Sequence, residues 1–138
     1  MRQAVGEISV ATRGQALYEV TREIEGWLRA QTPRDGLLTI FCRHTSASLV
    51  IQENADPSVL RDLNAAFARL APEGVRYEHD TEGPDDMPAH IRAALTQTSL
   101  SIPVAGGKAM LGTWQGVYLF EHRRAAHRRH LALHYVGS

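Results

Sequence analysis

Two hydrophobic patterns divide this chain of 138 residues. Near both ends, apolar residues alternate with polar ones or form short runs, which is typical of strands, whereas in the middle they recur every three or four residues, which is typical of amphipathic helices. This order predicts an α+β fold with a mixed, mostly antiparallel sheet, and not a repeated β–α–β unit. The expected strands span residues 5–10, 17–20, 37–42, 47–51, 100–104, 110–111, 117–119 and 131–136, and the expected helices span 21–30, 57–70 and 87–95.

Composition limits the classes of protein that this chain can belong to. Its length suits a single domain over residues 1–138, and 43% hydrophobic residues suffice for a core. A formal net charge of zero argues against nonspecific electrostatic binding to nucleic acid or to an anionic membrane. No apolar run approaches the ~20 residues of a membrane span, and no signal segment is visible. Because Cys42 is the only cysteine, we expect a cytoplasmic protein without disulfides or a cysteine-based zinc site.

The segment Tyr77–His90 is the densest in groups that bind cations or move protons. It holds His79, His90 and the acidic residues Asp80, Glu82, Asp85 and Asp86, of which Asp85 is expected to face water. Two prolines and a glycine exclude most of the segment from a helix interior. It is therefore either a solvated loop or one wall of a site.

Three histidines that follow or begin predicted elements could converge on a divalent metal ion. They are His44, His79 and His90, and neutral imidazoles are common metal ligands. Asp80 or Asp86 could be a further ligand, or could hold one ring in the correct tautomer. The alternative is that each histidine makes only a structural hydrogen bond at the end of a strand.

Two further polar clusters follow strands. Glu53 and Asn54 come after a buried strand, where loop residues often carry function, whereas Asp56 is explained as the N-cap of the helix that Pro57 begins. The second cluster comprises Thr113, Trp114 and Gln115, which lie between two glycines, with Glu121 beyond them. Trp114 is either a platform for a flat ring or a cap on the core, and Glu121 is either functional or a surface charge.

A basic run covers His122–His130 and contains Arg123, Arg124, Arg128 and Arg129. Arginine forks suit phosphate, so the run predicts an anion site or, alternatively, a solvated turn. Nucleic acid is not expected, because no aromatic residues are interleaved with the arginines.

Four segments together resemble the YjbQ family, known as the secondary thiamine-phosphate synthase family. They are HTSASLVIQENADP (44–57), YEHDTEGPDDMPAHI (77–91), SIPVAGG (101–107) and LGTWQGVYLFEHR (111–123). The resemblance covers about Gly6 to Gly137. It implies a half-barrel or sandwich-like α+β domain with about three helices, a homotrimer, and a polar cleft near a subunit interface.

The resemblance also implies an enzyme that condenses an aminopyrimidine-methyl diphosphate with a thiazole phosphate and releases pyrophosphate, assisted by Zn²⁺ or Mg²⁺. The alternatives are a metal-dependent hydrolase and a non-catalytic trimeric module that binds a small phosphorylated molecule. The residues expected to act are, as metal ligands, His44, His79 and His90; as catalytic groups, Asp86, Asp80, Glu53, Asn54 and Glu121; and as substrate-binding groups, Thr45, Thr113, Trp114, Gln115, Arg123 and Arg128.

Overall fold

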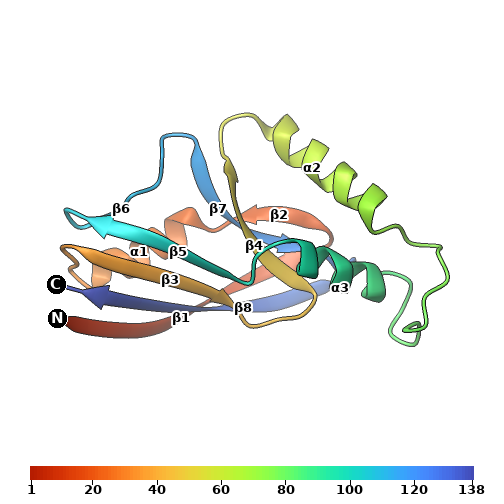
Figure 1. The fold of residues 1–138 in the computed structure, drawn as a ribbon, viewed down its shortest axis with the longest axis horizontal. Helices are drawn as coiled ribbons and strands as arrows, with labels where there is room; N and C mark the ends of the chain where they lie inside the picture. The colour runs from red at the N-terminus through yellow and green to blue at the C-terminus, as the bar shows by residue number, and fades with distance from the viewer.

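The structure, a computed structural model, describes all 138 residues and contains eight strands and three helices (Figure 1). In chain order they are β1 (Arg2–Arg13), β2 (Ala16–Glu19), α1 (Thr21–Ala30), β3 (Gly36–Cys42), β4 (Ala47–Glu53), α2 (Pro57–Leu70), α3 (Asp86–Leu95), β5 (Ser99–Ala105), β6 (Lys108–Ala109), β7 (Gln115–Glu121) and β8 (Ala126–Gly137).

The strands form two antiparallel sheets. Five strands pair in the order β1-β8-β3-β5-β6, and three pair in the order β2-β7-β4. One of the sheets forms a half-barrel. The predicted α+β class is confirmed, and every strand pairing is antiparallel.

The core lies between the inner faces of the two sheets and α1. The period-two pattern of β3 points Leu38 and Ile40 inward, and both are completely buried. On α1, Ile24 and Leu28 lie four residues apart and therefore on one helix face, and each is only 2% exposed. Burial of this stripe explains why α1 has the boundaries that the sequence predicted. None of the three helices has the length and apolar character that crossing a membrane requires.

The predicted start of α2 is also confirmed. The Asp56 carboxylate accepts a hydrogen bond from the backbone N–H of Ser58 at 2.9 Å, and Pro57 occupies the first helical turn. No residue of α2 is fully buried, but the Phe67 ring meets the Phe120 ring edge-on with 5.2 Å between centroids. The chain then runs through residues 71–85 to α3, and this long connection carries His79 (Figure 1).

Several strands are longer than predicted, and the predictions for two segments were wrong. Residues 110–111 are not in a strand, because the short strand β6 ends just before them, at Ala109. Much of the basic run lies in β8, not in a turn, because β8 pairs with β1 over twelve residues, from Arg2 opposite Gly137 to Arg13 opposite Ala126. These backbone hydrogen bonds form whatever the polarity of the side chains, so they override the local charge.

Candidate metal centre

His79, Asp86 and His90 meet at the start of α3. The Asp86 Oδ2 atom lies 2.6 Å from Nε2 of His79 and 3.2 Å from Nε2 of His90. One donor atom from each residue falls within 4.8 Å of the other two. The two imidazole rings are 5.5 Å apart between centroids. Two imidazole nitrogens and one carboxylate oxygen therefore lie close enough together to serve as three ligands of one metal ion.

The local sequence explains how these side chains meet. Asp86 and His90 are four residues apart in the first two turns of α3, so their side chains lie on the same face of the helix. His79 comes from the connection that precedes α3, which the intervening Gly83 and Pro84 keep out of a helix. A helix therefore fixes two of the three groups, and a loop supplies the third.

Arg123, in the turn between β7 and β8, fastens that loop. Its Nη1 donates to Asp86 Oδ1 at 2.6 Å, its Nε donates to Asp85 Oδ2 at 2.9 Å, and its Nη2 donates to the Glu82 carbonyl at 2.9 Å. The backbone N–H of Arg124 also donates to Asp85 Oδ2. Asp85 is therefore 7% exposed and bound to arginine, and the expectation that it faces water was wrong.

The same contacts keep Asp86 ionised. Burial by itself raises the pKa of the Asp86 carboxyl, but the hydrogen bond with His79, the electrostatic influence of His90 and the charge of Arg123 more than offset burial, and its pKa is lowered. Because Arg123 occupies Oδ1, the other oxygen, Oδ2, faces the two imidazoles. The carboxylate is thus presented to a cation through one oxygen.

His90 is oriented by a second contact. Its Nδ1 lies 3.1 Å from the carbonyl oxygen of Thr45, which can only accept a hydrogen bond, so Nδ1 carries the proton. In the neutral ring Nε2 is then the atom with the free electron pair, and it is the atom beside Asp86. A backbone carbonyl that fixes the tautomer in this way is a usual companion of a metal-binding histidine.

His44 lies outside this cluster. Its Nε2 accepts a hydrogen bond from the backbone N–H of His130 at 2.7 Å, and the two rings stack with 5.9 Å between centroids. The structure therefore does not bring the three expected histidines together within the chain: His79 and His90 meet, and Asp86 supplies the third group. Thr45, expected to bind substrate, contacts the centre through its backbone carbonyl.

Five of the expected site residues form a separate cluster where β4 ends and β7 begins. Asn54 donates from its backbone to the Trp114 carbonyl at 3.0 Å, and the Gln115 side chain accepts from the backbone N–H of Gly112 at 2.7 Å. Trp114 is 64% exposed, so it does not cap the core. The members of this cluster are Glu53, Asn54, Thr113, Trp114 and Gln115.

Glu121 is not a surface charge, since it is completely buried. Its oxygens accept hydrogen bonds from the Thr12 hydroxyl at 2.6 Å, from Nε and Nη2 of Arg129, and from the backbone N–H groups of His122 and Arg123. Burial raises the pKa of the Glu121 carboxyl, but the hydrogen bonds from Arg129 and Thr12 prevail and lower it. Glu121 thus anchors the turn that presents Arg123.

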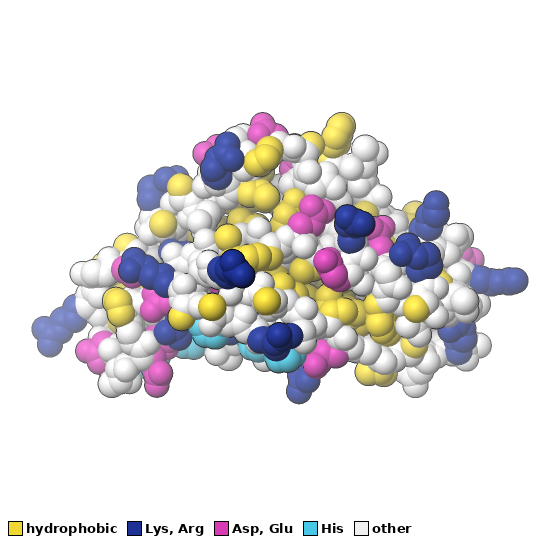
Figure 2. Space-filling model, turned by 180° about the vertical axis from the view of Figure 1, so that it is seen from behind, with side chains coloured by type: hydrophobic (Ala, Val, Ile, Leu, Met, Phe, Trp, Pro, Cys, Tyr) yellow, Lys and Arg dark blue, Asp and Glu magenta, His cyan; other side chains and the backbone are white.

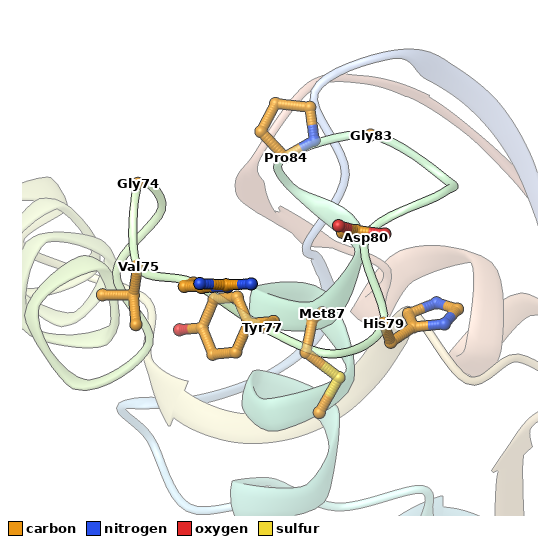
Figure 3. Close-up of a pocket in the computed structure, with 9 residues that line it drawn as sticks. Gly74, Val75, Tyr77, His79, Asp80, Gly83, Pro84 and Met87 are labelled. Carbon is orange, nitrogen blue, oxygen red and sulfur yellow. The ribbon is translucent and has the colours of Figure 1, made fainter.

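Asp80 and Arg128 do not belong to the three-ligand cluster. Asp80 is exposed and lines a cavity of about 420 Å³ with Val75, Tyr77 and Met87, on the loop that leads to α3 (Figure 3). Arg128 is exposed on β8, opposite Ala11 of β1.

The loop-fastening contact of Arg123 was missed from the sequence. The sequence does contain two dipeptides of opposite charge that could have suggested it, Asp85-Asp86 and Arg123-Arg124. From the sequence alone, however, these dipeptides could equally lie on separate faces of the protein. Only the fold shows that the two dipeptides meet.

Residues 6–138 match the family model described as "UPF0047 protein YjbQ-like". The chain belongs to this family. A UPF0047 protein of Synechocystis is 53% identical over 138 residues, which cover 99% of this chain and 94% of the relative. UPF0047 protein YjbQ of Escherichia coli is 45% identical over 118 residues, 84% and 85% of the two chains.

Solved structures agree with the fold of this family member. An uncharacterised protein of the YjbQ/UPF0047 family from Clostridium acetobutylicum superposes with a TM-score of 0.88 at 32% identity, covering 95% of this chain and 99% of that one. A hypothetical protein from Aeropyrum pernix gives a TM-score of 0.90 at 29% identity, covering 98% and 99%.

These comparisons correct the expected activity. The matched relatives are named only as UPF0047 proteins, and the matched structures as hypothetical or uncharacterised proteins. None of them carries the name of a thiamine-phosphate synthase. The assignment of that condensation to this UPF0047 family member was therefore wrong.

Proposed function

We propose that this protein binds a divalent transition-metal ion through His79, Asp86 and His90. The observation that carries the proposal is the convergence of three ligand atoms within 4.8 Å, with each of two ligands held by an outer contact. Arg123 holds Asp86, and the Thr45 carbonyl holds His90. Such outer contacts are typical of metal centres, because they aim the ligands before the ion arrives.

The ligand set favours Zn²⁺ or a similar transition metal over Mg²⁺. Two of the three donor atoms are imidazole nitrogens, which suit zinc, copper, iron and nickel, whereas Mg²⁺ prefers oxygen ligands and water. This narrows the choice between zinc and magnesium that the sequence left open.

The centre is built as an open one. The side chains of His79 and His90 are 43% and 34% exposed, whereas that of Asp86 is 7% exposed. A metal with three protein ligands keeps positions for water or for a small ligand, as catalytic zinc sites do. An ion bound there would supply a Lewis acid and would lower the pKa of its bound water. The protein would hold the ion from the buried Asp86 side and leave the histidine side accessible.

Isothermal titration of tag-free, chelator-treated protein with Zn²⁺ tests the proposal. We expect one ion per chain, and affinity reduced by more than about a hundredfold in both His79→Ala and His90→Ala. The matched control is His134→Ala, because His134 lies on β8 and its ring hydrogen-bonds only with Gln3. Zinc binding that is equally tight in all four proteins would show that the centre is wrongly placed.

Two expectations from the sequence, a homotrimer and a cytoplasmic location, remain proposals. A homotrimer is supported by exposed apolar side chains on the outer face of the five-stranded sheet, where Val5 is 77%, Phe41 47% and Leu37 39% exposed. In Figure 2, hydrophobic side chains also gather in the middle of one face, with charges of both signs around them. Light scattering after size exclusion would test the trimer.

A cytoplasmic location is supported by the single, buried, free cysteine, Cys42.

A further inference from the structure

We infer that a second site, a groove beside Thr45, binds the oxyanion group of a small molecule. The groove has a volume of about 680 Å³ and lies where β3 ends and β4 begins. Its polar lining comes from Arg43, His44, Thr45, Ser46, Thr98 and Arg129. This site goes beyond the proposed metal centre and does not depend on it.

His44 offers the groove a hydrogen-bond donor. Its Nε2 accepts the backbone N–H of His130, so this nitrogen carries no proton. Burial, and then the nearby charge of Arg129, lower the pKa of the ring, which is therefore neutral near pH 7. The single proton of the neutral ring is on Nδ1, and Nδ1 has no hydrogen-bond partner in the chain.

Arg129 supplies a fixed positive group. It is 4% exposed, and its Nε and Nη2 are taken by Glu121. Nη2 also donates to the Ser46 hydroxyl oxygen at 3.0 Å, which leaves the Ser46 proton free to donate elsewhere. Nη1 of Arg129 makes no hydrogen bond within the chain. A guanidinium held rigidly on one edge and unpartnered at Nη1 is prepared to receive an acceptor.

No carboxylate lines the groove. The acidic residues that contact the lining already have partners. The buried Glu121 carboxylate accepts five hydrogen bonds, and Glu7 forms an ion pair with Nη1 of Arg43 at 2.7 Å. The hydroxyls of Thr45 and Thr98 line the groove without a side-chain partner. A concave surface with this excess of donors selects a ligand that only accepts hydrogen bonds, which describes a phosphate or carboxylate group.

The size of the groove and its position indicate the class of ligand. A volume of about 680 Å³ is in the range of small-molecule sites and exceeds what one oxyanion group fills. The ligand is therefore a small organic molecule with an anionic head. The Thr45 residue that lines the groove also accepts the hydrogen bond from His90 of the metal centre, so the remainder of the ligand would extend beside that centre.

The test uses inorganic phosphate and acetate as probes of the whole, chelator-treated protein. We expect phosphate or acetate to bind by isothermal titration, and the tighter probe identifies the head group. His44→Ala and Thr98→Val should each weaken binding by about tenfold or more, because each removes one hydrogen bond to a charged ligand. His134→Ala, which leaves the groove intact, should bind as the parent does. Both groove side chains are at least partly exposed, so the variants should fold, as circular dichroism would verify.

Three results would overturn the inference. The first is that the parent binds neither probe, and the second is that the groove variants bind the probe as tightly as His134→Ala does. The third is that the probe binds only after zinc is added, because the anion would then be a metal ligand. The His79→Ala variant separates the two sites. This variant should lose zinc binding and keep phosphate or acetate binding. Either proposal, the metal centre or the anion groove, can therefore fail without the other.

Discussion

His122 gives the protein a defined sensitivity to acid. Its side chain is completely buried: Nε2 lies 2.8 Å from the Ser48 hydroxyl, Nδ1 has no partner, and the ring packs on Phe120 with 4.4 Å between centroids. Burial and the charge of Arg92 lower the pKa of His122 to about 3. A proton on this ring would be poorly solvated, so the folded protein resists it.

The size of the effect follows from this shift. An unfolded chain takes up the histidine proton near pH 6.5, whereas the folded protein does so only near pH 3. Between those values only the unfolded state gains the proton, so stability is complete above about pH 6.5 and falls as the pH decreases, by about 1.4 kcal/mol for each pH unit. Asp85, Asp86 and Glu121 have lowered pKa values too, but as carboxylates they lose stability only at more acidic pH.

Urea unfolding of the parent and of His122→Gln at about pH 7, 6 and 5 measures this slope. Glutamine keeps a polar atom toward Ser48 but takes up no proton. The free energy of unfolding of the parent should fall more steeply than that of the variant, by about 1.4 kcal/mol per pH unit below pH 6. The pKa of His44 is lowered as well and adds to the slope in both proteins, so the difference isolates His122. Parallel lines for the two proteins would refute the reasoning.

Two further predictions concern single residues. Arg123→Gln should reduce zinc affinity by about ten- to hundredfold and speed proteolysis of the loop before α3, because the loop loses three hydrogen bonds; unchanged affinity would mean that Asp86 needs no such support. Gly6→Ala should destabilise the protein by about 1–3 kcal/mol, because its methyl group would collide with the Trp27 indole. The matched Gly26→Ala, whose methyl group would meet only the Arg29 side chain at 3.9 Å, should instead stabilise α1 by about 0.5–1 kcal/mol. Thermal melting of both glycine variants checks this pair, and an equal loss in both would contradict it.

The elements that the sequence predicted well have local causes. α1 follows from the spacing of Ile24 and Leu28, and the start of α2 follows from the capping chemistry of Asp56 and Pro57. The extent of β8 has no local cause. Its first residues are basic and read as a turn, and only pairing with β1 twelve residues long makes them a strand. Pairings between distant segments are what a local pattern does not contain.

The site divides in the same way. His79 and His90 were predicted as metal ligands, and Asp86 as a catalytic group or further ligand, because all three lie within one short segment, and the structure brings them together. The position of His44 depends on the pairing of β3 with β8, which sets Cys42 opposite Leu131 and brings the next residues beside His130. The sequence could name His44 as polar and placed at a strand end, but the register decides that it meets a backbone N–H and not the other two histidines.

A crystal of the protein grown with zinc tests the central claim most directly. An anomalous difference map collected at the zinc edge should show an ion about 2.0–2.2 Å from Nε2 of His79, Nε2 of His90 and Oδ2 of Asp86. Arg123 should remain on Oδ1 of Asp86, and the Thr45 carbonyl on Nδ1 of His90. An ordered zinc ion elsewhere, for example between His44 and His130, with none among His79, Asp86 and His90, would contradict the account.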